Sequence, residues 1–127
     1  MRNRAVIGTP DAPEAIGPYS QAVKSGNTVW LSGQIPLVPG SMEVVEGDIT
    51  ARATQVFSNL AAVAAAAGGS LDNAVKINIS LTDLADFAAV NEVMASFVQE
   101  PYPARACVQV AALPRGVDIE VEAILAL

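Results

Sequence analysis

The sequence predicts a single α+β domain over residues 1–127, with the element order β-β-α-β-α-β-β and two helices packed on one face of a mixed sheet. Two segments repeat apolar residues with a helical period, whereas others alternate apolar and polar residues as strands do. Strand–helix–strand crossovers are almost always right-handed, so both helices are expected on the same face. The other face of the sheet is left without a helix to cover it.

The first third of the chain predicts a β-hairpin between two irregular segments. Residues 1–18 are rich in Gly, Pro and Asp and predict an ordered but irregular lead-in. Residues 22–24 and 28–31 predict two strands joined by a Ser-Gly-Asn turn. Residues 35–47 contain two prolines and two glycines and predict a loop.

The middle of the chain predicts the first helix and the strand that follows it. Asp48 is suited to cap a helix, and apolar residues then recur with a helical period until Gly68 and Gly69 end it. Residues 75–81 alternate apolar and polar side chains, which predicts a strand with one polar face.

The last third predicts a second helix and two further strands. Asp83 caps a helix that extends to residue 97, and strands follow at residues 106–111 and 117–127. The last five residues are apolar on both sides of their strand, which predicts burial of both sides. We therefore expect the uncovered face of the sheet to pack against other subunits.

Composition excludes several classes of function. The chain has 7 basic and 13 acidic residues, a net charge of −6, which disfavours binding to nucleic acid. It has no histidine and one cysteine, Cys107, which removes Ser-His-Asp chemistry and the common zinc sites, so no metal is expected. The longest apolar stretch, residues 60–67, is too short to span a bilayer, and a soluble cytoplasmic protein is expected.

One strand carries a candidate anion-binding residue. Strand alternation places Arg105, Cys107 and Gln109 on one face. The guanidinium of Arg105 is a fork that matches a carboxylate, so it is a candidate anchor for a carboxylate ligand. A structural ion pair with an Asp or Glu of the chain is the more common role, and this segment alone favours that alternative.

The last strand carries the candidate base. Asp118, Glu120 and Glu122 share one face of it, and a solvated acidic stripe is the common reason for such alternation. In a chain without histidine, however, a carboxylate is the best available base. Glu120 is therefore the candidate that activates water, with Glu122 as the alternative.

Three further positions are weaker candidates. Tyr19 follows Gly-Pro and is either a packed ring or a polar group in a cleft. Ser32 and Gly33 end a strand, where glycine permits a bulge or the close approach of a ligand. Cys107 is expected to be a small buried side chain rather than a nucleophile, because no feature predicts a lowered thiol pKa.

Taken together, these segments resemble the RidA/YjgF family. The matches are collinear and extend over about residues 12–126. They are the segments at 15–22, 32–36, 47–49, 59–60, 67–68, 75–76, 86–87, 90–91, 103–105 and 117–120. The resemblance implies a chorismate-mutase-like fold and a homotrimer with clefts between subunits.

The resemblance also implies an activity. Family members of the archetypal type hydrolyse reactive 2-imino or 2-enamino acids, such as 2-iminopropanoate, 2-iminobutanoate and 2-aminoacrylate, to 2-oxo acids and ammonia. They need no cofactor. In this chain the resemblance implies that Arg105 holds the substrate carboxylate and Glu120 orients the water. Tyr19 and Ser32 would line the cleft, the backbone of Gly33 and Cys107 would contact the substrate, and Tyr19 would also assist proton transfer.

The chain departs from the family pattern in three places. The loop at residues 40–43 lacks the usual Thr-Gly turn, residues 77–79 read Ile-Asn-Ile where Thr-Thr-Val is common, and Met94 stands where an aromatic residue is usual. These changes, Asn78 included, bear on the substrate range rather than on the reaction.

Strand spacing adds a geometric expectation. If the last two strands form a simple hairpin, Arg105 and Glu120 lie roughly 16 Å apart, which is too far for joint action on a three-carbon acid. We therefore expect the site to combine residues of two subunits, and one cleft within a single chain would contradict this. Two alternatives remain: a non-catalytic module that binds small carboxylates, and an endoribonuclease or translation inhibitor, which the net charge of −6 disfavours.

Overall fold

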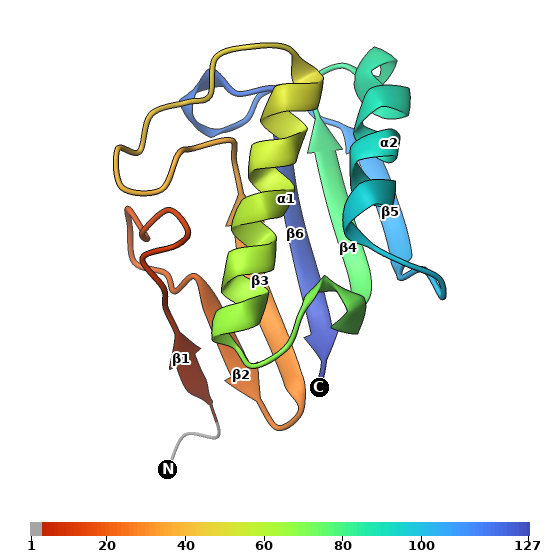
Figure 1. The fold of residues 1–127 in the computed structure, drawn as a ribbon. Helices are drawn as coiled ribbons and strands as arrows, with labels where there is room; N and C mark the ends of the chain where they lie inside the picture. The colour runs from red at the N-terminus through yellow and green to blue at the C-terminus, as the bar shows by residue number, and fades with distance from the viewer. Residues whose placement is uncertain (1–3) are drawn as a thin grey trace.

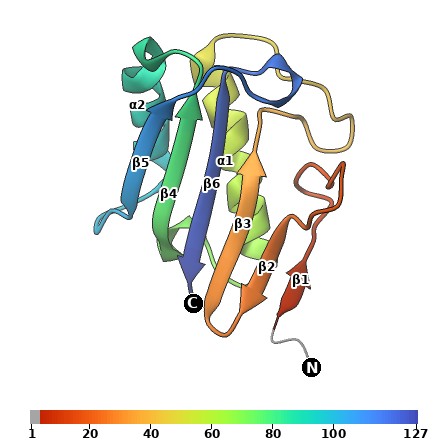
Figure 2. The same cartoon turned by 180° about the vertical axis from the view of Figure 1, so that it is seen from behind.

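The computed structural model describes residues 4–127, which form one six-stranded sheet covered on one face by two helices (Figures 1 and 2). The strand order is β1-β2-β3-β6-β4-β5, and every neighbouring pair is antiparallel except β4 and β5. The strands are β1 (Ala5–Ile7), β2 (Ala22–Ser25), β3 (Thr28–Gln34), β4 (Ala74–Leu81), β5 (Ala104–Gln109) and β6 (Ile119–Ala126). The helices are α1 (Ile49–Ala66) and α2 (Phe87–Phe97). The predicted α+β fold with both helices on one face is confirmed.

The core lies between the helices and the sheet. Helix α1 begins where the Asp48 side chain accepts a hydrogen bond from the Ala51 backbone N–H, as the sequence predicts. Its apolar stripe buries Val56, Phe57 and Leu60 against the sheet. No helix within residues 4–127 is long and apolar enough to cross a membrane.

Two details of the predicted topology are wrong. The lead-in contains a short strand, β1, that pairs with β2, although three residues between irregular segments gave little signal. The last two strands do not form a hairpin, because β4 lies between β5 and β6. The crossover through α2 makes β5 a parallel neighbour of β4 at the edge of the sheet.

The two faces of the sheet differ in polarity. Ile77, Ile79 and Leu81 of β4 are buried beneath the helices. The alternate β4 residues point to the other face, which we call the open face because no helix covers it (Figure 2). The open face carries Glu120 and Glu122 of β6 beside Ser80 and Asn78 of β4.

Side-chain amides hold the two irregular segments against this framework. The buried Gln21 side chain accepts a hydrogen bond from the Thr9 N–H and donates to carbonyls of Thr9, Ala12 and Pro13. The buried Asn59 of α1 donates to the Leu37 carbonyl in the loop before the helix. The described part of the lead-in, residues 4–18, is thus ordered, as predicted, and residues 1–3 lie outside the described residues.

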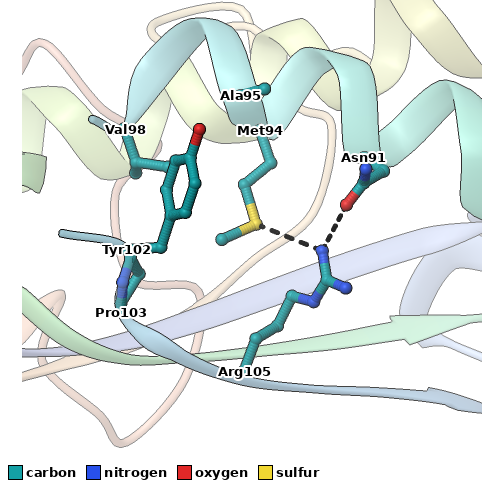
Figure 3. A pocket seen from close by; sticks show the side chains of 7 residues that line it. All are labelled: Asn91, Met94, Ala95, Val98, Tyr102, Pro103 and Arg105. Atoms are coloured by element: carbon teal, nitrogen blue, oxygen red, sulfur yellow. Dashed lines mark hydrogen bonds between the residues drawn. The ribbon is translucent and has the colours of Figure 1, made fainter. Parts of the chain in front are cut away.

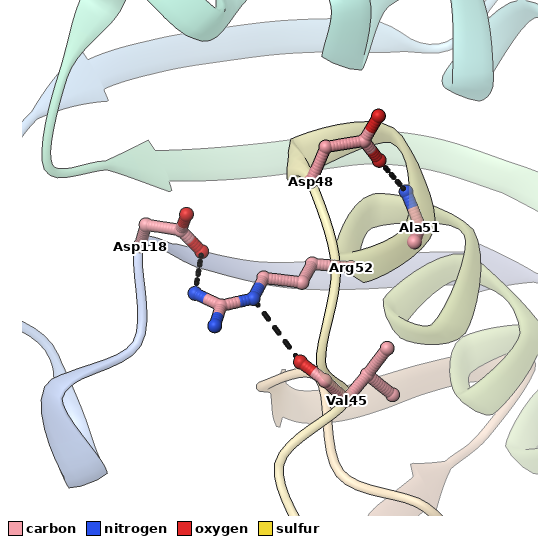
Figure 4. A network of polar contacts seen from close by, with 5 residues as sticks. All are labelled: Val45, Asp48, Ala51, Arg52 and Asp118. Atoms are coloured by element: carbon pink, nitrogen blue, oxygen red, sulfur yellow. Dashed lines mark hydrogen bonds and ion pairs between the residues drawn. The ribbon is translucent and has the colours of Figure 1, made fainter.

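An ion pair ties the start of β6 to the start of α1. Arg52 Nη1 lies 3.2 Å from Asp118 Oδ1, and Arg52 Nε donates to the Val45 carbonyl at 3.2 Å (Figure 4). Asp118 is two residues before Glu120, so this contact fixes the end of the strand that carries the candidate base.

Candidate functional site

The structure separates the predicted site residues into two groups on opposite faces of the sheet. Arg105 and Cys107 lie on the helix face of β5, whereas Glu120 lies on the open face of β6 beside Ser32, Gly33 and the loop that carries Tyr19.

Arg105 points toward α2 and is held there by uncharged groups. Its Nη1 donates to Asn91 Oδ1 and lies 4.0 Å from Met94 Sδ (Figure 3). The guanidinium carbon also lies 5.1 Å from the centre of the Phe87 ring, in a cation–π contact. Among residues 4–127 no carboxylate pairs with Arg105, so the structural ion pair favoured by its segment alone is absent there.

One edge of the guanidinium is free to bind an anion. Within the described chain, the hydrogen bonds of Arg105 all use Nη1, which leaves Nε and Nη2 without a protein acceptor. The N–H bonds of these two atoms point in the same direction and match the two oxygens of a carboxylate. The exposed side chain therefore presents a positive charge and a bidentate fork to solvent.

A pocket opens beside this guanidinium, between α2, β5 and the segment that joins them. Its volume is about 410 Å³. Its walls are mainly apolar, with the Arg105 side chain at one side (Figure 3). The lining residues are Asn91, Met94, Ala95, Val98, Tyr102, Pro103 and Arg105.

Cys107 lies two residues after Arg105 and packs against the core. Partial burial raises the pKa of the Cys107 thiol, while the positive charge of Arg105 lowers it to a smaller extent. The thiol is therefore protonated near neutral pH, which agrees with the expectation that it is not a nucleophile.

The Glu120 carboxyl group lies directly over Gly33. A β-bulge places Ser32 and Gly33 opposite the single residue Glu122, between the pairs Leu31–Ala123 and Gln34–Val121. A Cβ atom at position 33 would lie 2.9 Å from Glu120 Cδ and 3.1 Å from Oε1. Glycine is thus required here so that the carboxyl group can lie against the strand.

The surroundings of Glu120 favour its protonated form. Partial burial raises the pKa of the Glu120 carboxyl above its ordinary value, and the negative charge of Glu122 raises it further. Glu122 itself accepts a hydrogen bond from Asn78 Nδ2 at 3.2 Å. A carboxylate whose pKa is raised toward neutrality is a better general base than an ordinary one.

Ser32 connects Glu120's surroundings to the loop that carries Tyr19. Its Oγ donates to the Ser20 carbonyl at 2.6 Å, and its N–H donates to the Gln21 carbonyl at 2.9 Å. The half-exposed Tyr19 ring stands next to this contact, and its hydroxyl accepts from the Ile16 N–H at 3.4 Å.

Register shows that the two groups do not meet within one chain. Ile77 pairs with Arg105, and Ser80 pairs with Glu120, three residues further along β4. Arg105 and Glu120 are therefore two strand spacings and three residues apart, which separates their Cα atoms by roughly 14 Å. Because the side chains also point to opposite faces, Arg105 and Glu120 of one chain do not share a cleft.

Sequence reasoning assigned no role to Phe87 and Asn91, which together with Met94 hold Arg105. Phe87, Asn91 and Met94 lie four and three residues apart, so one face of α2 presents all three to the guanidinium. This spacing was visible in the sequence, but the pairing of α2 with β5 was needed to interpret it.

Comparisons with known proteins identify the family and the fold. The family model described as Endoribonuclease L-PSP matches residues 9–127. The 2-iminobutanoate/2-iminopropanoate deaminase of Dermatophagoides farinae is 46% identical over 100% of this chain and 99% of its own. The RidA structure from the Antarctic bacterium Psychrobacter sp. PAMC 21119 is 57% identical, with a TM-score of 0.93 over 97% of this chain and 99% of that chain.

A further solved structure is that of E. coli TdcF with bound serine, 42% identical with a TM-score of 0.91 over 97% of this chain and 98% of that chain. The fold is thus the one that the resemblance implied. With the model match over most of the chain and relatives of this identity over nearly its whole length, the chain belongs to the Endoribonuclease L-PSP family, also called the RidA/YjgF family.

Proposed function

We propose that this chain is an imine deaminase that hydrolyses 2-imino acids, and their 2-enamino tautomers, to 2-oxo acids and ammonia. The observation that carries the proposal is the Arg105 guanidinium, which presents an unpaired bidentate edge beside a pocket. The relative from Dermatophagoides farinae is named for this activity on 2-iminobutanoate and 2-iminopropanoate. The bound serine of E. coli TdcF supports binding of a compound with an α-carboxylate and an α-nitrogen.

The residues account for each step of the reaction. Arg105 Nε–H and Nη2–H hold the carboxylate and so fix the position of C2. Glu120 accepts a proton from water as the water oxygen forms a bond to the iminium C2, which gives a carbinolamine. The amine nitrogen then takes up that proton, the C–N bond breaks, ammonia leaves, and the C2 hydroxyl becomes the carbonyl of the 2-oxo acid as its proton is released. Half-exposed Tyr19 lines the cleft and assists proton transfer.

We further propose that each site is built from two subunits of a homotrimer. The open face supports this assembly, because it exposes apolar side chains of three strands with no helix over them. These are Val6, Trp30 and Val108. In the trimer Arg105, Cys107 and the pocket of one subunit face Glu120, Gly33, Ser32 and Tyr19 of its neighbour. The cytoplasmic location expected from the sequence stays a prediction.

The test follows the loss of imine in solution. A serine or threonine dehydratase generates 2-aminoacrylate or its four-carbon homologue, and the rate of 2-oxo acid formation is compared with buffer alone. Wild type accelerates the reaction, and Arg105→Ala lowers kcat/KM about 100-fold or more because a charge-assisted fork is lost. Equal rates for wild type, Arg105→Ala and buffer would refute the proposal.

Glu120→Gln distinguishes an enzyme from a module that only binds carboxylates. The variant lowers kcat by about 100-fold or more but still binds a small carboxylate such as propanoate with the affinity of wild type. If wild type itself binds propanoate but does not accelerate hydrolysis, the chain is a binding module.

A further inference from the structure

Two carboxyl groups of β6 are within reach of the space over Gly33. Glu120 and Glu122 both point to the open face, and the β-bulge that contains Gly33 lies opposite Glu122. The carboxyl group that lies over Gly33 is nevertheless that of Glu120. The backbone register alone therefore does not determine which of the two carboxyl groups takes this place.

The Glu122 side chain is held on the other side of β6. Its Oε1 accepts a hydrogen bond from Asn78 Nδ2 at 3.2 Å. Asn78 is the residue of β4 directly opposite Glu122, and β3 and β4 flank β6 on opposite sides (Figure 2). The hydrogen bond thus draws the Glu122 carboxyl group toward β4, whereas the Glu120 carboxyl group lies against Gly33 of β3.

Asn78 is the contact that retains Glu122 at β4. In the part of the chain that the structure describes, no other group donates a hydrogen bond to the Glu122 side chain, and no cation pairs with it. Lys76 lies two residues before Asn78 on β4 but forms no ion pair there. The two carboxyl groups also interact, because the charge of Glu122 raises the pKa of Glu120. Loss of the Asn78 contact therefore affects the surroundings of Glu120.

We propose that Asn78 is a positioning residue, which gives the place over Gly33, and with it the role of base, to Glu120 rather than to Glu122. It does so by holding the Glu122 side chain against β4. The inference rests on the proposed deaminase function and adds to it what selects between the two candidate bases of β6. Because Asn78 acts through Glu122, its effect on the reaction depends on the presence of the Glu122 carboxyl group.

Asn78→Asp tests the hydrogen bond with a side chain of the same shape. The new carboxylate cannot donate to Glu122 and repels it, so the Glu122 side chain turns toward β3 and displaces the Glu120 carboxyl group. We expect kcat for the dehydratase-generated imine to fall about tenfold, measured at a pH above the acidic limb. Asn78→Ala removes the donor without adding a charge, so kcat falls less. A wild-type kcat in Asn78→Asp would overturn the inference.

Removal of Glu122 distinguishes positioning from a structural role. In a Glu122→Ala background no second carboxyl group can take the place over Gly33, so the further change Asn78→Asp alters kcat by less than about twofold. A tenfold fall in both backgrounds would show that Asn78 supports the fold or acts on Glu120 directly, and would refute the inference. Circular dichroism of each variant checks that the fold is retained.

Asn27→Asp is the matched control for the added charge. Asn27 is exposed in the turn between β2 and β3, next to Thr28, which pairs with Ala126. Ala126 lies six residues after Glu120 on β6, roughly 20 Å along the strand. We expect the kcat of wild type for this variant. If Asn27→Asp lowers kcat as much as Asn78→Asp does, the effect comes from net charge and the positioning role is refuted.

Crystal structures of wild type and Asn78→Asp test the arrangement without turnover. In the variant we expect the Glu122 carboxyl group to lie toward β3 and the Glu120 carboxyl group to have left its place over Gly33. An unchanged Glu120 carboxyl group in the variant would overturn the inference. If the two side chains move as expected but wild type does not accelerate hydrolysis, the deaminase function alone is refuted.

Discussion

At the scale of single residues, the position of the Glu120 carboxyl group depends on the residue across from it. A Cβ at position 33 would lie 2.9 Å from Glu120 Cδ, which real atoms do not tolerate. Gly33→Ala therefore displaces a flexible carboxyl group rather than the backbone. We expect kcat to fall about tenfold, because the carboxyl group proposed as the base is misplaced. The free energy of unfolding changes by less than about 1 kcal/mol.

Gly8→Ala is the control for that substitution, because its Cβ would lie 3.8 Å from Gln21 Oε1, an ordinary contact. Steady-state kinetics and urea unfolding of both variants give the comparison. A Gly33→Ala enzyme with wild-type kcat would show that the carboxyl position does not matter for turnover.

A second residue-scale prediction concerns pH. The Glu120 pKa is raised by burial and, to a smaller extent, by the charge of Glu122. In the proposed mechanism only ionised Glu120 accepts the proton of water, so we expect activity to fall as the pH falls through the Glu120 pKa. Glu122→Gln removes a negative charge, lowers the Glu120 pKa, and moves the acidic limb of the kcat/KM profile to lower pH. Glu92→Gln, on exposed α2 surface, leaves the limb in place.

The opposite result has a clear meaning. A shift of the acidic limb to higher pH in Glu122→Gln, or equal shifts in both variants, would show that the limb reports another group. The kcat/KM profile also reports the titration of the free imine, which does not depend on Glu122, so a wild-type limb in Glu122→Gln would assign it to the substrate.

At the scale of elements, the irregular lead-in depends on one side chain. Gln21 makes four hydrogen bonds to the backbone of residues 9, 12 and 13. It follows Tyr19 by two residues, so these bonds also hold the loop that contains Tyr19. Gln21→Leu leaves buried carbonyls without donors, and we expect the free energy of unfolding to fall by about 2–4 kcal/mol. The exposed Gln99→Leu changes it by less than about 0.5 kcal/mol. Urea unfolding checks both, and equal losses would contradict this role.

The same scale shows what the sequence alone could predict. Helical periods, caps and alternation identify α1, α2 and the main strands, because these signals are local. Strand neighbours are not local: β5 and β6 follow each other in sequence, yet β4 separates them. The contact of Gly33 with Glu120 depends on the register of β3 against β6, which residues 87 positions apart in the chain do not reveal. The pocket likewise depends on how α2 meets β5.

At the scale of the whole molecule, the two groups of candidate site residues lie on opposite faces of the sheet, and this determines how a site can form. Arg105 belongs to the helix face at one edge of the sheet, and Glu120 belongs to the open face near its middle. No rotation of side chains in one chain brings them to one substrate. Joint action therefore requires a second copy whose open face meets the β5 edge, and closed symmetry then repeats the site in each subunit.

Mixed oligomers test this requirement directly. Arg105→Ala and Glu120→Ala chains with different tags are co-expressed, and trimers that contain both are purified by the two tags in turn. In the assembly proposed above, each mixed trimer has one subunit boundary at which an intact Arg105 faces an intact Glu120. We expect about one third of the wild-type kcat per trimer, whereas each variant alone is inactive. A site within a single chain predicts no recovery, since every chain then lacks one of the two residues, and inactive mixed trimers would thus refute the shared site.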